Sequence, residues 1–256
     1  MTDREELREI VRQLNIIDDT LFQKMVEDID FCEEMISTIM EQKIKVKKVI
    51  PQNSIKNLQG RSVILDSLCE TDDGREFNVE VQKANDDDHA RRVRYNTSCI
   101  TANVTDPGVK FEKVPDVIGI YISKFDMFKG DKTVYHIDRV IRETGETQDN
   151  GLKEIYVNTK IDDGSNIAEL MRIFKEPHTY NFKKFPKISK RKKLFKENEG
   201  GRETMCELVE NYAKKREKES ALRLFQNGAS YELVRTSITS LTDEELQEIY
   251  QNATKS

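Results

Sequence analysis

Two carboxylates near the middle of the chain have the residue types and spacing for metal chemistry. Asp66 lies in an apolar stretch at 63–68, and Glu80 lies in a second one at 77–82 that also contains Gln82. Carboxylate oxygens are ligands that a hard divalent cation such as Mg²⁺ prefers. If the two stretches pair as strands, the sequence predicts a shared acidic patch at which a cation could assist hydrolysis of a phosphodiester.

The tripeptide Asp72-Asp73-Gly74 between these stretches is typical of a tight turn. Glycine adopts a positive φ without steric cost, so we expect a three-residue loop with Gly74 in the left-handed conformation. That loop places Asp66 opposite Glu80, with Cβ atoms about 4.5–5.5 Å apart. Like charges at this separation destabilise the pair, and a divalent cation would neutralise them. A loop of two or four residues would break this pairing.

The same register predicts which side chains of the hairpin face the core, because successive side chains of a strand point to opposite faces. Ile64 then pairs with Gln82 on the acidic face. The core face is expected to hold three pairs: Leu65 with Val81, Ser67 with Val79, and Cys69 with Phe77.

A helix that could bind phosphate is expected after the hairpin. Negative charge at 86–88 favours a helix N-terminus, and the helix should run to about residue 101. Arg91 and Tyr95 are four residues apart and share a face, where the arginine can bind a phosphate bidentately and the tyrosine can donate a hydrogen bond or stack on a base. Alternatively, Tyr95 packs in the core and the arginines pair with the aspartates. We prefer this second interpretation for Arg92 and Arg94.

These motifs resemble those of the PD-(D/E)XK nucleases, and in particular the recombination-promoting Rpn nucleases, a branch of PD-(D/E)XK transposases. The similarity rests on Asp66, the turn, the pair Glu80 and Gln82, and the Arg-Arg-x-Arg-Tyr helix at 91–95, and it extends over 19–180. It implies an α/β (α+β) fold: a restriction-endonuclease-like core with a mixed central sheet flanked by helices, and a helical C-terminal extension.

The resemblance also implies a function and a site. The function is that of a metal-dependent DNA endonuclease of low sequence specificity, associated with a mobile element or recombination. Asp66, Glu80 and the carbonyl of Val81 would bind Mg²⁺, with Mn²⁺ able to substitute. Gln82 stands where a lysine is usual, and an amide can orient water but carries no charge. It is therefore expected either to act in catalysis beside Asp66 and Glu80 or to bond its neighbours on the sheet.

A basic segment at 183–196 is a second candidate for DNA binding. It carries eight lysines and arginines, among them Lys190, Arg191, Lys192 and Lys193, interrupted by apolar residues. Such a segment can neutralise phosphates without reading bases. It can equally be a solvated connector that its apolar residues anchor.

Periodicity and apolar runs predict the remaining elements. We expect helices at 3–14, 21–42, 167–174, 202–227, 230–236 and from 242 onward, and five strands at 63–68, 77–82, 114–123, 133–137 and 152–158. In the nuclease family, the helix here expected at 21–42 can lend an acidic group to the metal site, for which Asp19 and Glu27 are candidates. A helix cap and a solvent-facing glutamate are the commoner roles for such residues.

Length and composition indicate one substantial domain with an appendage. The chain has 256 residues, of which 35% are charged, and we expect a nuclease-like domain at 1–180, a basic connector at 181–201 and a helical extension at 202–256. The extension resembles a helix-turn-helix remnant. Its alternative is a helical hairpin that closes the domain or pairs with a second subunit, so a homodimer remains open.

Several classes of protein are not expected from this sequence. The net charge of −5 argues against a histone-like binder. The acidic opening and the lack of an apolar run of about 18 residues argue against a signal peptide or a membrane span, which favours a cytoplasmic protein. Four scattered cysteines and three histidines give no zinc or disulfide framework, and no small-molecule cofactor is expected.

Three functions remain open, in order of preference. The first is the Mg²⁺-dependent endonuclease acting on DNA. The second is a catalytically silent protein on the same scaffold that binds nucleic acid or oligomerises, in which Gln82 marks lost chemistry. The third is a helical assembly protein, which would leave the paired carboxylates without a purpose.

Overall fold

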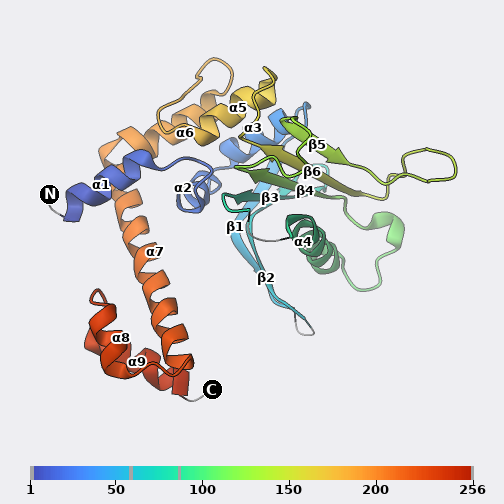
Figure 1. The fold of residues 1–256 in the computed structure, drawn as a ribbon. Helices are drawn as coiled ribbons and strands as arrows, with labels where there is room; N and C mark the ends of the chain where they lie inside the picture. The colour runs from blue at the N-terminus through green and yellow to red at the C-terminus, as the bar shows by residue number, and fades with distance from the viewer. Residues whose placement is uncertain (1–2, 58–59, 86–87, 255–256) are drawn as a thin grey trace. The chain divides into compact units, whose positions relative to one another are not determined.

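A six-stranded mixed sheet organises the part of the chain that the computed structural model describes, residues 3–57, 60–85 and 88–254 (Figure 1). The strand order is β1-β2-β3-β4-β6-β5, in which β3, β4 and β6 are parallel and the other neighbours are antiparallel. The strands are β1 Val46–Ile55, β2 Val63–Thr71, β3 Glu76–Gln82, β4 Val117–Ser123, β5 Val134–Ile137 and β6 Leu152–Asn158. The predicted mixed α/β class is confirmed.

Helices precede, interrupt and follow this sheet. They are α1 Asp3–Gln13, α2 Asp19–Met25, α3 Ile29–Ile39, α4 His89–Val104, the 3₁₀ turn η1 Phe111–Lys113, α5 Asn166–Lys175, α6 Pro186–Glu197, α7 Glu199–Gln226, α8 Tyr231–Ser237 and α9 Asp243–Thr254. The chain divides into two compact units, Arg12–Lys196 and the combination of Met1–Val11 with Glu197–Ser256. The first unit contains the whole sheet, and α6 belongs to it.

The edge strand β1 is missing from the elements expected on sequence grounds, so the count of five strands was wrong. Pro51 lies within it and pairs with Ser67 of β2. Proline cannot donate a hydrogen bond to a ladder, which argues against a central strand but not against an edge strand. The sheet order places β1 at the edge, where one side of the strand needs no partner.

The hairpin of β2 and β3 has the predicted register over its ladder, which ends at Ser67/Val79 before the expected pairs Asp66/Glu80, Leu65/Val81 and Ile64/Gln82. Ser67 pairs with Val79 and Cys69 with Phe77, and all four side chains are buried. The turn is a three-residue loop in which Thr71 and Arg75 close the ladder, and Gly74 has a φ of 83°. A local turn signal thus sets which face of the hairpin each downstream side chain occupies.

The single helix expected at 21–42 is two helices. α2 ends at Met25, and α3 begins after Asp28, whose extended backbone and side chain form an N-cap by accepting a hydrogen bond from Phe31 N at 2.9 Å. Aspartate competes with helix continuation in this way because its carboxylate satisfies an amide that would otherwise have no partner. The break lets Phe22 of α2 meet Phe31 of α3 edge to face, with ring centroids 6.4 Å apart.

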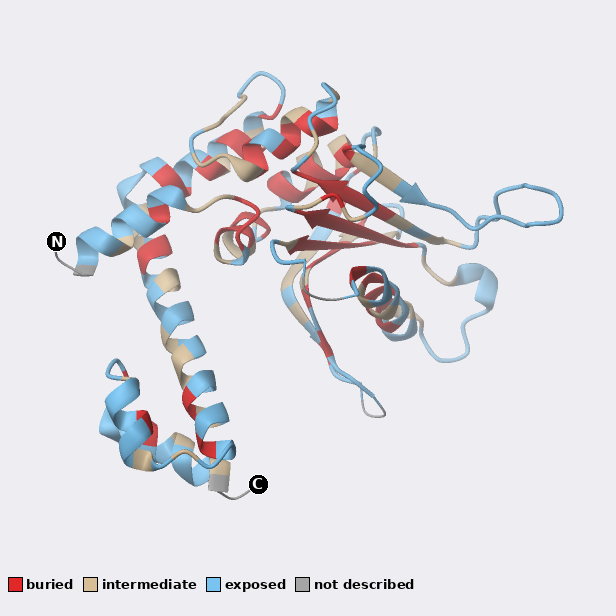
Figure 2. Cartoon of the chain, viewed as in Figure 1, coloured by how far each residue is buried: buried red, intermediate tan, exposed pale blue. Residues whose placement is uncertain are grey.

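Helices cover both faces of the sheet (Figures 1 and 2). α4 lies against one face, and α3 and α5 lie on the other, where Phe31 and Phe174 stack with centroids 6.3 Å apart. The central strand β4 is buried over its whole length. Gly119 of β4 makes room for α4: a Cβ there would lie 3.0 Å from a Thr97 carbon and 3.2 Å from a Val93 carbon.

In the second unit, the start of α9 and the end of α7 have the caps that the sequence predicts. Thr242 and Glu245 form a reciprocal capping box at the start of α9, with bonds of 3.1 and 3.3 Å. After α7, Gly228 takes a φ of 84°, as a left-handed helix end requires. Ala221 and Phe225 of α7 pack on buried residues of α8 and α9.

Replacing Gly119 with alanine should destabilise the sheet unit. The new methyl meets two buried β-branched side chains of α4 that have little freedom to move, and overpacking of this kind costs about 1–3 kcal/mol. Chemical denaturation would show a lower midpoint for Gly119→Ala. Gly200→Ala is the control, because its Cβ would meet only Asn198 Oδ1 at 3.7 Å. Equal stability of Gly119→Ala and wild type would mean that α4 lies further from β4.

Candidate active site

The hairpin brings Asp66 and Glu80 together just beyond its regular ladder. The backbone pairing of β2 with β3 runs from Glu70/Glu76 to Ser67/Val79. One residue further, the side chain of Asp66 contacts β3, because its Oδ2 accepts a hydrogen bond from Val81 N at 3.1 Å. The carboxylate of Asp66 is thereby fixed beside the strand that carries Glu80.

Burial makes this pair electrostatically unusual. Glu80 is 2% exposed, and burial followed by the like charge of Asp66 raises its pKa to about 8. The pKa of Asp66 rises to about 6, mainly through burial, while the amide of Val81 and the side chain of Gln52 lower it by hydrogen bonding. At neutral pH, the two groups therefore tend to hold a proton unless a cation is nearby.

A second pair of carboxylates lies on the same hairpin, and nearby lysines compensate its charge. Glu70 and Glu76 face each other directly in the ladder. Glu70 also forms an ion pair of 2.7 Å with Lys47, and Lys47 and Lys48 lower the pKa of Glu76, which burial raises to about 7. Lysines at the sheet edge therefore offset this pair, whereas Asp66 and Glu80 are enclosed.

Two side chains of α4 that were not candidates on sequence grounds, Arg92 and Asn96, approach Glu80. Arg92 Nη2 lies 3.8 Å from Glu80 Oε2, and Asn96 Nδ2 donates to Glu80 Oε1 at 3.4 Å. Arg92 also lowers the pKa of both Asp66 and Glu80 through its charge. Arg92 was expected to pair with the aspartates at 86–88. Its described ion pair is with Glu80, and because Asp86 and Asp87 lie outside the described residues, the pairing with them stays a prediction. The spacing of four residues between Arg92 and Asn96 was the signal available in the sequence.

Asp19 of α2 belongs to the same electrostatic environment. Its charge raises the pKa of Asp66, and its own pKa is raised by burial and then by Asp18, while Lys83 and Arg92 lower it. Lys83 forms an ion pair with Asp18. The other candidate from this region, Glu27, instead pairs with Lys24 at 2.7 Å on the surface. The structure thus favours Asp19 over Glu27 as an additional acidic group.

Gln52 of β1 is a further residue that only the structure reveals. It lies between Pro51 and Asn53, which pair with Ser67 and Leu65, and so stands opposite Asp66. Its φ is 49°, in the left-handed region that a glutamine seldom adopts. Its side chain bonds to Asp66 and lowers the pKa of that carboxyl. Backbone strain beside a buried carboxylate is a feature that functional sites share.

Gln82 ends β3, two residues beyond Glu80, and so lies on the same side of the strand. Its Nε2 donates to the carbonyl of Ala84 at 2.9 Å. The amide thus makes a local main-chain contact just beyond the end of β3, and its expected catalytic role stays a prediction. Positive charge beside Asp66 and Glu80 comes instead from Arg92, while Lys83 pairs with Asp18 and lowers the pKa of Asp19.

The two residues expected to bind DNA on α4 occupy different environments. Arg91 is exposed and forms an ion pair of 3.3 Å with Asp88, which also caps α4 by accepting from Arg91 N at 3.1 Å. Tyr95 donates its hydroxyl to the carbonyl of Arg61 at 2.6 Å. It therefore ties α4 to the segment before β2. Asp86 and Asp87, which were expected to share the helix start, lie outside the described residues.

The basic segment forms the helix α6, and part of its charge is inside the protein. Lys192 is 0% exposed and donates to the carbonyls of Ile173 at 2.8 Å, Thr179 at 3.1 Å and Glu176. Those carbonyls lie at the end of α5 and just after it, where helical acceptors have no partner of their own. Lys192 thus presents no charge to a nucleic acid at the surface.

Other cations of α6 act in the same way. Arg191 Nε donates to the carbonyl of Met25 at 2.8 Å, at the end of α2, and its guanidinium pairs with Asp28 at 3.1 Å. Lys196 reaches the carbonyls of Arg12 and Leu14 near the end of α1. Of the four residues proposed to bind DNA from this segment, Lys190 and Lys193 are exposed.

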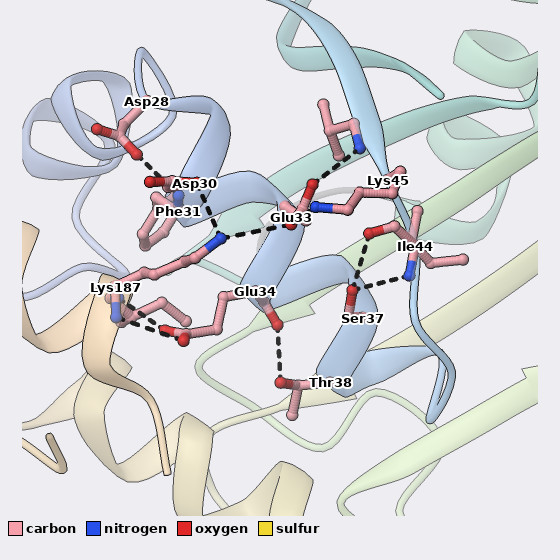
Figure 3. Close-up of polar contacts among 12 residues, drawn as sticks. Asp28, Asp30, Phe31, Glu33, Glu34, Ser37, Thr38, Ile44, Lys45 and Lys187 are labelled. Carbon is pink, nitrogen blue, oxygen red and sulfur yellow. Dashed lines mark hydrogen bonds and ion pairs between the residues drawn. The ribbon is translucent and has the colours of Figure 1, made fainter. Parts of the chain in front are cut away.

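Acidic residues of α3 hold the start of α6 (Figure 3). Glu34 accepts from the amides of Lys187 and Ile188 at 3.3 and 2.8 Å, and the Lys187 ammonium pairs with Asp30 at 2.8 Å. A carboxylate at a helix N-terminus is favourable because the first amides lack intrahelical acceptors. The basic segment is therefore helical over α6 and packs against α3.

The carboxylate pair has features that suit a hard divalent cation, although it is a sparse donor set. Glu80 Oε2 is buried and accepts no hydrogen bond within the described structure. No cluster of three or more His, Cys, Asp or Glu side chains that could bind a metal occurs among the described residues. Two carboxylates therefore fit an ion that keeps several waters, as Mg²⁺ does.

One comparison with known proteins gives a match. The family model of the PD-(D/E)XK nuclease family transposases matches residues 24–220, which include both carboxylates and α4. No curated protein and no solved structure matches the chain. Among the described helices, none is long and apolar enough to span a membrane.

In the absence of divalent metal, the protein should lose stability as the pH rises from about 4.5 to 8. The folded pKa of Glu80 is about 8, above its unfolded value of about 4.5, so the folded state binds more protons in this range and is favoured at the acidic end. Glu80→Gln should raise the melting temperature at pH 8 in EDTA, and millimolar Mg²⁺ should raise that of wild type. If Glu80→Gln is no more stable than wild type at pH 8, burial of the ionised Glu80 carboxylate does not destabilise the protein, and the prediction is wrong.

Replacing a buried and an exposed lysine of α6 in separate variants should change the free energy of unfolding by different amounts. Lys192→Met removes a donor to three carbonyls and should cost about 2–4 kcal/mol of unfolding free energy. Lys190→Met, two residues earlier and exposed, should change it by about 0.5 kcal/mol or less. Urea denaturation of the two variants measures both values. Similar small losses would place Lys192 in solvent.

Proposed function

Because the chain belongs to the PD-(D/E)XK nuclease family transposases, we propose that it is a metal-dependent DNA endonuclease of low sequence specificity that uses Mg²⁺, with Mn²⁺ able to substitute. The family is one of nucleases associated with transposition, which supports DNA as the substrate and mobile-element recombination as the setting. The observation that carries the proposal is the pair of half-buried Asp66 and buried Glu80, in which Glu80 Oε2 accepts no hydrogen bond from the described residues.

In the proposed site, Asp66, Glu80 and the carbonyl of Val81 would hold Mg²⁺. Asp19 would act at longer range, as an additional negative charge near the ion. When bound, the ion would lower the pKa of a water and neutralise charge on the scissile phosphate. Asp66 is already oriented for this role, since Val81 N and Gln52 fix its carboxylate. Preorganised ligands of this kind do not have to rearrange when substrate binds.

Hydrolysis requires that a water oxygen bond to phosphorus while the bond to the departing 3′ oxygen breaks. We assign Gln82 to orient this water through its amide, since the side chain cannot take up a proton. Arg92, which lies 3.8 Å from Glu80 in the absence of substrate, is placed to bind the phosphoryl oxygens as their charge increases. The attacking water releases its proton to solvent, because Gln82 cannot accept it, and the departing 3′ oxygen takes up a proton from a solvent water.

A catalytically silent DNA-binding protein is the second candidate, and one contact favours it. The Gln82 amide donates to the carbonyl of Ala84 at 2.9 Å, a contact that competes with orienting a water for catalysis. In this alternative, the cation would stabilise the fold and the protein would bind DNA without cutting it. The two candidates predict the same response of stability to metal and opposite results with plasmid DNA.

Wild type should cleave supercoiled plasmid in Mg²⁺ and not in EDTA, and Glu80→Gln should reduce the rate by at least about 10²-fold by removing a charged ligand. Glu76→Gln is the matched control, because the residue lies on the same strand and faces Glu70 instead of Asp66. Its cleavage rate should equal that of wild type. Plasmid that stays intact with wild type in Mg²⁺ would select the silent alternative. Equal cleavage rates for Glu80→Gln and Glu76→Gln would mean that the active site does not include Glu80.

A further inference from the structure

A groove rich in arginine opens beside the carboxylate pair. It has a volume of about 680 Å³ and lies between α4 and the residues that begin β2. Four arginines line it: Arg61, Arg91, Arg92 and Arg94. Asp88 is its one acidic lining residue among those described. The groove thus has an excess of positive charge in a protein with a net charge of −5.

The groove is continuous with the candidate active site. Arg92 and Asn96 belong to its lining, and both contact Glu80, at 3.8 and 3.4 Å. A phosphate chain that follows the groove would therefore pass Arg92 and Asn96, the two residues of α4 that contact Glu80. This continuity distinguishes the groove from the exposed lysines of α6, a helix that is bonded to α3 and to the end of α5.

Two of the four arginines have charge that the protein does not use internally. Arg91 pairs with Asp88, and Arg92 pairs with Glu80. The guanidinium groups of Arg61 and Arg94 make no ion pair or hydrogen bond with any described residue. Arg91 and Arg94 are three residues apart on α4 and so share a face about one turn apart. Such spacing suits successive phosphates of one strand.

The opposite wall of the groove suits a sugar-phosphate backbone better than a free anion. Val63 and Ile64 of β2 line it, and Ile64 is 60% exposed, an unusual position for a branched apolar side chain. Deoxyribose rings alternate with phosphates along DNA, so a wall with both apolar and cationic groups can contact both. A small inorganic anion would leave the apolar part without a partner.

Tyr95 holds the two walls together. Its hydroxyl donates to the carbonyl of Arg61 at 2.6 Å and accepts from Asn57 Nδ2 at 3.3 Å. These bonds fix the backbone of Arg61 against α4. The tyrosine is therefore a positioning residue for Arg61, and its hydroxyl is already committed and is not free to bind a base.

We propose that Arg61 and Arg94, on opposite walls of this groove, bind phosphates of a DNA strand and lead it to Asp66 and Glu80. The proposal rests on the proposed function for the identity of the substrate. It assigns DNA contact to one residue outside the motif at 91–95 and to one that the sequence suggested to be structural. It also replaces the expected stacking role of Tyr95 with the positioning of Arg61.

Fluorescence anisotropy with labelled DNA duplexes of two unrelated sequences, in EDTA to prevent cleavage, tests the groove. Arg61→Ala with Arg94→Ala should weaken binding about tenfold to a hundredfold for both sequences. The slope of log affinity against log salt should decrease by about 0.9 for each phosphate that the variant no longer neutralises, or about 1.8 for the double variant. Arg142→Ala with Arg216→Ala removes the same charge from positions outside the groove and should leave the slope unchanged.

Tyr95→Phe tests the positioning role. Loss of its hydroxyl should weaken binding in wild type but have much less effect when Arg61 is already alanine, because the tyrosine acts through that residue. Circular dichroism and the melting temperature of every variant report on folding. If the double variant fails to fold, the single variants Arg61→Ala and Arg94→Ala, both exposed in the native protein, provide the same slope measurement.

The possible results separate this inference from the proposed function. An unchanged affinity and salt slope in Arg61→Ala with Arg94→Ala would overturn the groove, whether or not wild type cuts plasmid. The same holds if Lys190→Ala with Lys193→Ala lowers the slope instead, or if wild type binds no DNA. Loss of binding in the groove variants, with no cleavage by wild type in Mg²⁺, would support the groove and reject the nuclease.

Discussion

The enclosure of two carboxylates between a hairpin and a helix is the constraint on which the rest of the site depends. Asp66 and Glu80 are close and poorly solvated, and burial is the largest contribution to the raised pKa of each. A buried carboxylate must be protonated, paired or bound to a cation. Arg92 supplies only part of that charge, since its nearest nitrogen lies 3.8 Å from Glu80. This shortage of compensating charge is the reason that we propose a divalent cation at the pair.

α4 combines three tasks that depend on its close approach to the sheet. Gly119 of β4 has no side chain under α4, so Val93 and Thr97 of the helix lie directly on the strand. This approach brings Arg92 to Glu80 on one side of the helix and leaves Arg94 facing the groove on another. Because 3.6 residues form one turn, neighbours in sequence point in different directions. The run of arginines is thus divided between neutralising the carboxylates and offering charge to a ligand.

The basic helix α6 shows that positive charge can serve packing rather than binding. Lys192 and Lys196 are buried, and their ammonium groups donate to carbonyls near the ends of α5 and α1. Helix C-termini carry partial negative charge and acceptors without partners, so a lysine there replaces water. Burial nevertheless lowers the pKa of Lys192 to about 7. The same residues that suggest a nucleic-acid surface in the sequence are needed to assemble the first unit.

The sequence by itself determined the features that depend on residues a few positions apart. Asp72-Asp73-Gly74 set the hairpin register through the left-handed Gly74, and that register predicted the encounter of Asp66 with Glu80. Tertiary structure decided the features that join distant segments. Only packing shows that Pro51 can lie in an edge strand, that Gln52 reaches Asp66, and that Arg92 rather than Arg91 meets Glu80. Turn chemistry and capping act within one or two turns of chain, whereas burial and the destination of a long charged side chain depend on what the fold places beside it.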